Sequence, residues 1–423
     1  MNLPKYVYNC DDFKPGDQVQ YSGPYFDETE IEYAIKALRT GKWLTAGEHV
    51  NKFEARFSKK FNVGYSQMVN SGSSANLVMF TALKRHFNWA DGDEVIVSPV
   101  GFPTTISPIV QNNLVPVFID IETVTLNFDV NHIEDSITPK TKAIIVSPVL
   151  GNPPNMDILK DICERHNILL IGDNCDSLGS KWNVKYITDY YYAWTCSFYP
   201  AHHISTGEGG MVCSDDESFV ERARSIAWWG RDCYCVGASN ALCSGTCGNR
   251  FDKWLDGYDG IVDHKYVFTE MGYNLKPLDL QGAIGLAQLE KFDKVEELRR
   301  KHFKRIKEIV ESNLVFITIP ESLPEADPSW FGVPILCDNR YVREDLTKHL
   351  ESNKIQTRPL FAGNILMHPA YKHLGDYREF PNSNAAFSNV VFLGCPPHYN
   401  DAVFDYIEDV FSRFPNKLYD IRG

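Results

Sequence analysis

The stretch NSGSSAN at 70–76 carries the residue types of a phosphate-binding site. It follows a short apolar run and opens a helix, so its main-chain amides would lie at a helix N-terminus, where anions bind. Gly72 lets the backbone approach a ligand closely, and the hydroxyls of Ser73 and Ser74 add donors. An ordinary serine-capped helix has the same pattern, so the stretch alone does not identify a ligand.

A carboxylate and an imidazole follow later in the chain. Asp173 ends the apolar run ILLIGD, and open α/β sheets bind their ligands at the carboxyl ends of such strands. A carboxylate there could keep a pyridine nitrogen protonated, although a helix-capping aspartate gives the same pattern. His202 lies in SFYPAHHISTGEGG (197–210), and an imidazole can move a proton near neutral pH.

The cysteines form a second group of candidate functional residues. Of eleven, four fall within the fifteen residues 233–247: Cys233, Cys235, Cys243 and Cys247. In a cytosolic chain such a cluster favours metal binding or catalysis over disulfides. Apart from Cys175, the others are interpreted as core or surface thiols, namely Cys10, Cys163, Cys196, Cys213, Cys337 and Cys395.

The elements that must position these residues are those of an α/β fold. Continuous apolar strands separated by helices favour a mostly parallel sheet covered on both faces. A first helix is expected after Asp27, with Glu30 completing a capping box and Gly41 ending it. We expect strands at 93–100, 115–121, 142–149, 168–173 and 193–198, and helices at 75–88 and around 155–166.

Length and composition set the domain organisation. The 423 residues are long enough for two or three domains, and we expect a large domain over 1–305 and a small α+β domain over 306–423. The section 212–304 is expected to be helical at both ends, around a Cys- and Gly-rich loop at 231–266. A net charge of −13 argues against general nucleic-acid binding. Without a membrane-spanning run or a signal-peptide pattern, a cytoplasmic protein is expected.

The order and spacing of these stretches, together with GYNLKPLDLQGAIG (272–285), resemble the sugar aminotransferase family of fold-type I pyridoxal-phosphate enzymes over nearly the whole chain. The resemblance implies a mostly parallel seven-stranded sheet with helices on both faces, a smaller α+β C-terminal domain, and a homodimer with shared active sites. It also implies the contacts to the cofactor. The phosphate is bound by Gly72, Ser73, Ser74 and Ser197, and by Asn274 from the neighbouring subunit, while Asp173 meets the pyridine nitrogen and Phe102 stacks on the ring.

His202 occupies the position at which aminotransferases carry the lysine that binds the cofactor covalently. In this respect the chain resembles the sugar 3-dehydrases, which remove the C3 hydroxyl of nucleotide-linked 4-keto-6-deoxyhexoses. The resemblance implies pyridoxamine phosphate as cofactor and His202 as the base that removes a proton from its C4′ carbon. Asp176 and Tyr199 differ from the aminotransferase pattern and are assigned as catalytic or substrate-orienting; a helix cap and simple packing are the alternatives.

The stretches GDNCD, GRDCYC and TCGNRFD resemble the CDP-4-keto-6-deoxyglucose 3-dehydrase family, which holds a [2Fe–2S] cluster on the motif C-x57-C-x-C-x7-C. Here 57 residues separate Cys175 from Cys233, and Cys235 follows one residue later. Cys243 satisfies the x7 spacing, but Cys247 has the expected flanking residues and is favoured as the fourth ligand; a zinc site on the same thiolates is the alternative. The resemblance further implies an NAD(P)H-dependent flavin and iron–sulfur reductase as partner.

Two other functions remain open at this point. One is a cluster-free dehydratase that makes its own pyridoxamine phosphate with glutamate. The other is a non-catalytic, metal-stabilised protein on the same fold. The resemblance favours a CDP-linked substrate, although similar enzymes take TDP-linked sugars, and the sequence does not define the sugar stereochemistry.

Overall fold

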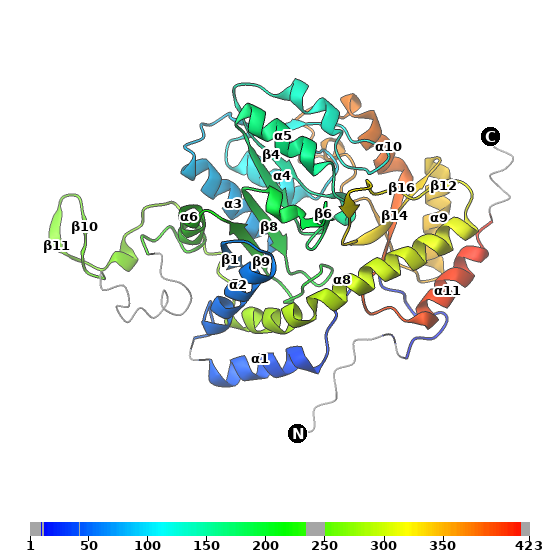
Figure 1. Cartoon of the computed structure of the whole chain (residues 1–423), viewed down its shortest axis with the longest axis horizontal. Helices are drawn as coiled ribbons and strands as arrows, with labels where there is room; N and C mark the ends of the chain where they lie inside the picture. The colour runs from blue at the N-terminus through cyan, green and yellow to red at the C-terminus, as the bar shows by residue number, and fades with distance from the viewer. Residues whose placement is uncertain (1–9, 11, 42, 234–249, 416–423) are drawn as a thin grey trace.

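The structure is a computed structural model that describes residues 10, 12–41, 43–233 and 250–415 (Figure 1). Helices and strands alternate through its first half, as the sequence predicts. The helices are α1 (Glu28–Thr40), α2 (Glu48–Lys60), α3 (Gly72–His86), α4 (Pro103–Gln111), α5 (Met156–His166), α6 (Glu217–Ala227), α8 (Asp279–Asn313), α9 (Arg340–Ser352), α10 (Pro381–Asn389) and α11 (Asp401–Ser412).

The central sheet has seven strands in the order β1-β9-β8-β5-β4-β2-β3. They are β1 (Tyr65–Val69), β2 (Glu94–Val97), β3 (Val115–Phe118), β4 (Thr141–Val146), β5 (Leu169–Asp173), β8 (Ala193–Ser197) and β9 (Gly210–Ser214). Only β9 runs antiparallel to its neighbours β1 and β8, so the sheet is mostly parallel, as predicted. The sequence analysis did not anticipate strand β9.

Both faces of this sheet are buried against helices. One core cluster joins the sheet to α2, α5 and the first part of α8, through residues such as Phe53, Leu159 and Phe292. A second cluster joins the opposite face to α3, α4 and α6, through residues such as Val78 and Ile109. The strands therefore bury both of their faces, which explains their continuous apolar sequence.

A smaller antiparallel sheet follows in the C-terminal part, in the order β12-β14-β16-β15. Its strands are β12 (Ile317–Thr318), β14 (Gly332–Cys337), β15 (Thr357–Pro359) and β16 (Val390–Gly394). Helix α8 is one unbroken helix that packs against α1 and α2 and also against α11 (Figure 1). It therefore crosses the domain boundary expected at residue 305. Two minor sheets complete the fold, made of β6 (Lys181–Trp182), β7 (Lys185–Tyr186) and β13 (Ala326–Asp327), and of β10 (Lys253–Leu255) and β11 (Tyr258–Val262).

The capping box predicted for the first helix is present. The Asp27 side chain accepts a hydrogen bond from the amide of Thr29, and Glu30 accepts one from the amide of Asp27 at 2.8 Å. In the described part of the chain, the helices lack a segment long and apolar enough to cross a membrane.

Candidate active site

A cavity of about 480 Å³ opens where β5 and β8 end, and most of the predicted site residues line it. Those that do are Gly72, Ser73, Phe102, Asp173, Cys175, Asp176, Ser197, Tyr199 and His202. Ser74, Cys233 and Asn274 are described residues that do not line this cavity. The structure therefore brings these predicted residues to one cavity, because the carboxyl ends of parallel strands meet at one end of a sheet.

The N-terminus of α3 forms one wall of the cavity. Ser71 caps the helix, since its hydroxyl accepts a hydrogen bond from the amide of Ser74 at 3.1 Å. Ser73, in the first turn of the helix, lines the cavity. A Cβ built on Gly72 would lie 2.4 Å from the Cβ of Ser197 and 3.1 Å from the sulfur of Cys175. Only glycine lets these three segments converge, and they bring main-chain amides and hydroxyls together at a helix N-terminus, where such groups can bind an anion.

Asp173 is a buried carboxylate held in one orientation. Its Oδ2 accepts hydrogen bonds from Asn76 at 2.8 Å and from Thr105 at 2.7 Å, and its Oδ1 accepts one from the amide of Cys175 at 3.2 Å. No basic side chain among the described residues forms an ion pair with it. A buried anion fixed in this way is suited to a cationic ligand group such as a protonated pyridine. The sequence analysis did not assign Asn76 or Thr105 to the site, although Asn76 ends the NSGSSAN stretch.

Phe102 supplies an exposed aromatic ring at the same cavity. It is the N-cap residue of α4, and 57 % of its surface is exposed. A large apolar side chain exposed inside a cavity is available to stack on a planar ligand.

His202 and Asp176 face each other in the cavity wall. The Nδ1 atom of His202 lies 3.4 Å from Oδ1 of Asp176. Burial, and then the Arg299 guanidinium, hold the pKa of His202 well below its usual range, whereas burial and the charge of Asp173 hold the pKa of Asp176 well above its own. Both shifts favour the neutral forms of the two side chains.

Arg299 holds the segment that carries His202, and the sequence analysis missed it. This α8 side chain is only 1 % exposed. Its guanidinium donates to the carbonyls of Ala201 at 2.8 Å and Phe331 at 3.2 Å, with longer bonds to the carbonyls of His202 and Trp330. Its position in a long charged helix gives no signal of this role, because only the tertiary structure buries it.

The described residues include two of the predicted cluster ligands. Cys175 lines the cavity beside Gly72, and Cys233 is buried. Cys235, Cys243 and Cys247 lie outside the described residues. Within the described ranges, no group of three or more His, Cys, Asp or Glu side chains could hold a metal ion.

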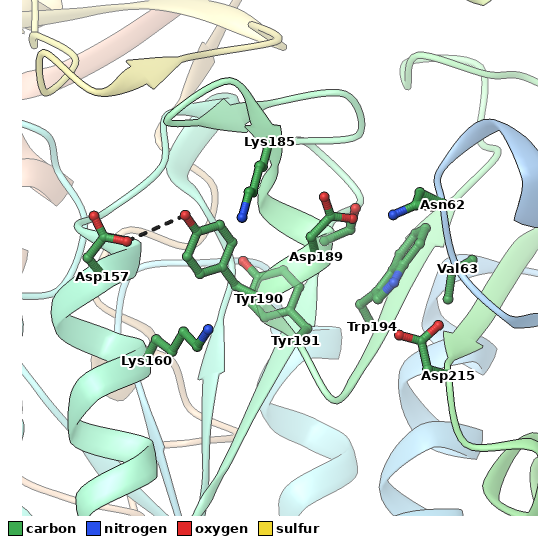
Figure 2. Close-up of a pocket in the computed structure, with 11 residues that line it drawn as sticks. Asn62, Val63, Asp157, Lys160, Lys185, Asp189, Tyr190, Tyr191, Trp194 and Asp215 are labelled. Carbon is green, nitrogen blue, oxygen red and sulfur yellow. Dashed lines mark hydrogen bonds between the residues drawn. The ribbon is translucent and has the colours of Figure 1, made fainter.

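A second pocket of about 480 Å³ lies at the other end of the strands, where β8 begins (Figure 2). Its wall is polar and includes Lys160, Lys185 and Asp189, and Asp157 accepts a hydrogen bond from Tyr190 there. None of the predicted site residues lines it. Of these two pockets, the residues predicted from the sequence line the cavity at the carboxyl ends of the strands.

The seven-stranded sheet, the anion site at α3 and the carboxylate at the end of β5 together define a fold-type I pyridoxal-phosphate-dependent aminotransferase fold. The chain belongs to the DegT/DnrJ/EryC1/StrS aminotransferase family, whose model matches residues 24–412. The resemblance found in the sequence is confirmed at this level.

Several relatives carry names of dehydratases. The chain is 38% identical over 402 residues to the lipopolysaccharide biosynthesis protein RfbH of Salmonella typhimurium, covering 93% of this chain and 91% of that protein. It is 38% identical over 409 residues to the dTDP-4-dehydro-2,6-dideoxy-D-glucose 3-dehydratase of Saccharopolyspora spinosa, covering 94% and 87%. The solved structure of an E. coli GDP-4-keto-6-deoxy-D-mannose-3-dehydratase with bound hydrated PLP is 29% identical, with a TM-score of 0.80 over 93% of this chain and 100% of that one.

Proposed function

We propose that this protein is a pyridoxamine-phosphate-dependent 3-dehydratase of a nucleotide-linked 4-keto-6-deoxyhexose. The observation that carries the proposal is the composition of the cavity wall. It combines the α3 anion site, Asp173 and His202, and no lysine is among the described residues that line it. Relatives named as nucleotide-sugar 3-dehydratases support this reading.

The residues of the cavity fit pyridoxamine phosphate. The helix N-terminus at Gly72, Ser73 and Ser197 suits the phosphate, because position 72 has no room for a Cβ and its backbone can approach a ligand closely. Asp173 suits the ring nitrogen, since its buried charge needs a cationic partner. Phe102 suits the ring face. When bound, the cofactor supplies an amine and an electron-accepting ring to the chemistry.

In the proposed reaction His202 removes the proton from the cofactor's C4′ carbon, and the C3 hydroxyl of the sugar leaves. A neutral imidazole can perform this step, whereas it cannot replace a lysine in binding the cofactor covalently. Oδ1 of Asp176 lies 3.4 Å from Nδ1 of His202, and a hydrogen bond formed between them in the loaded enzyme would orient the imidazole. Tyr199 is 46 % exposed and lines the cavity, so its hydroxyl is available to contact the sugar.

We further propose that Cys175, Cys233, Cys235 and Cys247 hold a [2Fe–2S] cluster, and that the substrate is CDP-linked. The sequence spacing of the cysteines supports the cluster, and the position of Cys175 in the cavity wall would bring one ligand to the substrate. A cluster supplies single electrons, and an NAD(P)H-dependent flavin and iron–sulfur reductase would deliver them. Asn274 would reach the cofactor phosphate of the neighbouring subunit in a homodimer.

Solvent deuterium exchange into the C4′ position of the cofactor tests the proposed base. Wild-type protein loaded with pyridoxamine phosphate and given substrate, but no reductase, should exchange this proton. His202→Asn should retain the cofactor and lose the exchange, because the phosphate contacts do not involve residue 202. Exchange at the wild-type rate in this variant would refute the role of His202. Iron content and absorbance after anaerobic purification distinguish the cluster enzyme from the glutamate-dependent alternative, which would contain no iron.

A further inference from the structure

One permanently charged cation stands among the described residues that line the active-site cavity. It is Arg358 of β15, a half-buried side chain contributed by the C-terminal sheet. The acidic side chains of that wall are Asp173, Asp176 and Glu208. The chain as a whole carries a net charge of −13. Among these lining residues Arg358 is therefore the side chain whose fixed positive charge can attract an anionic part of a ligand.

The Arg358 guanidinium is held in position by neutral groups. Its carbon atom lies 4.0 Å from the centroid of the Tyr21 ring, and Nη1 donates to the main-chain carbonyl of Thr357 at 2.7 Å. Within the described part of the chain, no carboxylate forms an ion pair with it. These contacts leave its remaining N–H groups available for an anion, and a guanidinium matches two oxygens of a phosphate at once.

The two segments that meet at this contact are fixed to each other. The amide of Gln356 donates to the carbonyl of Val19 at 3.0 Å, and the side chain of Gln356 accepts from the amide of Tyr21 at 3.2 Å. Arg358 follows two residues later and pairs with Phe392 of β16 in the antiparallel sheet. The guanidinium is therefore preorganised before a ligand binds, which limits the entropy lost on binding.

The segment directly after β15 holds a residue in an unfavourable backbone conformation. Phe361 lines the cavity three residues after Arg358 and has a φ of 48°, in the left-handed region that a side chain of its type rarely adopts. Such strain concentrates at ligand-binding segments, where the surrounding structure enforces it.

We infer that Arg358 binds the diphosphate of the nucleotide-linked substrate. This inference rests on the proposed function, because it takes the ligand to be a nucleoside diphosphate sugar. It adds a residue that favours this substrate class: the guanidinium holds two phosphate oxygens at once and gains from the larger negative charge of a diphosphate, and a sugar without a phosphate lacks this contact.

Calorimetric binding to the pyridoxamine-phosphate-loaded protein tests the inference. The probes are CDP, GDP, UDP and TDP, together with the monophosphate and the free nucleoside of whichever base binds best. Wild type should bind the diphosphate more tightly than the monophosphate. Arg358→Met should weaken diphosphate binding at least about tenfold, as expected for losing hydrogen bonds to a charged group, while affinity for the nucleoside is retained. Arg358→Lys should fall in between, because it keeps the charge and loses the planar fork.

Arg340→Met is the matched control. Arg340 also lies over a tyrosine, 4.8 Å from the centroid of the Tyr341 ring, but it is exposed on α9 and does not line the cavity. This variant should bind all probes as wild type does. Retained cofactor absorbance and an unchanged near-ultraviolet circular dichroism spectrum in Arg358→Lys and Arg358→Met establish that the site is intact.

The possible failures point to different conclusions. Wild-type diphosphate affinity in Arg358→Met would overturn the role of Arg358 and leave the proposed function standing. Loss of pyridoxamine phosphate from that variant, with diphosphate binding unchanged, would assign Arg358 to the cofactor phosphate instead. Failure of wild type to bind any of the four diphosphates would refute the proposed substrate class, and the inference with it.

Discussion

Replacing Gly72 by alanine should disable the phosphate site with a single methyl group. The added Cβ would lie 2.4 Å from the Cβ of Ser197, whereas carbon atoms in contact normally lie about 3.5–4.0 Å apart. Ser197 belongs to the fully buried strand β8 and cannot easily retreat. The first turn of α3 must therefore move away by roughly 1 Å.

This displacement should affect binding and stability to different degrees. Overpacking of this kind costs about 1–3 kcal/mol in the free energy of unfolding. The amides of the first turn would also lose their alignment with the phosphate, and each hydrogen bond to a charged group is worth about 1.5–3 kcal/mol. We expect the dissociation constant for pyridoxamine phosphate to rise at least about tenfold.

Equilibrium dialysis of pyridoxamine phosphate and urea unfolding of the apoprotein measure these two quantities. Gly101→Ala is the matched control, since a Cβ at that neighbouring glycine meets nothing within 4 Å, and it should behave as wild type in both assays. Adding Ser197→Gly to Gly72→Ala should restore stability, because it removes the clashing Cβ, but not full affinity. Gly72→Ala protein that binds the cofactor as tightly as wild type would refute the assignment of this helix terminus as the phosphate site.

Four further outcomes are expected. His202→Lys should form an imine with pyridoxal phosphate that borohydride traps on residue 202, and mass spectrometry of the peptide would detect it. Asn274→Ala should weaken cofactor binding, and mixing it with His202→Asn should restore some activity in heterodimers; no complementation would count against shared sites. Cys175→Ser and Cys233→Ser should each lower the iron content of anaerobically purified protein while C4′ exchange continues, whereas full iron in both would contradict the cluster assignment. Arg299→Met should slow C4′ exchange and lower the free energy of unfolding by about 1–3 kcal/mol, because it leaves the buried carbonyls of the His202 segment unpaired. Exchange at the wild-type rate in this variant would show that Arg299 does not position His202.

The sequence predicted the sheet, and the residues that it singled out line one cavity, because both signals are local. Apolar runs mark buried strands, Asp173 is the last residue of β5, and His202 lies in the segment that follows β8. The contacts that hold these residues were not predictable in the same way. Arg299 is 97 positions from His202 along the chain, and nothing in its helix shows that it is buried.

Arg358 illustrates the same limit at the substrate side of the cavity. It lies in a short strand of the C-terminal sheet, and only the pairing of that segment with residues 19–21 brings it to Tyr21. Strand β9 was missed for a related reason: it is a five-residue strand directly before α6, and its antiparallel pairing with β1 and β8 is a long-range feature.

The product formed by the wild-type protein tests the central claim most directly. Protein loaded with pyridoxamine phosphate, given a CDP-linked 4-keto-6-deoxyglucose, NADH and a flavin and iron–sulfur reductase, is analysed by mass spectrometry and NMR of the sugar. We expect a nucleotide-linked product whose hexose has lost its C3 hydroxyl and carries no amino group, because His202 moves a proton and cannot replace the lysine. A 4-amino sugar that keeps its C3 hydroxyl would show amino transfer and would contradict the assignment.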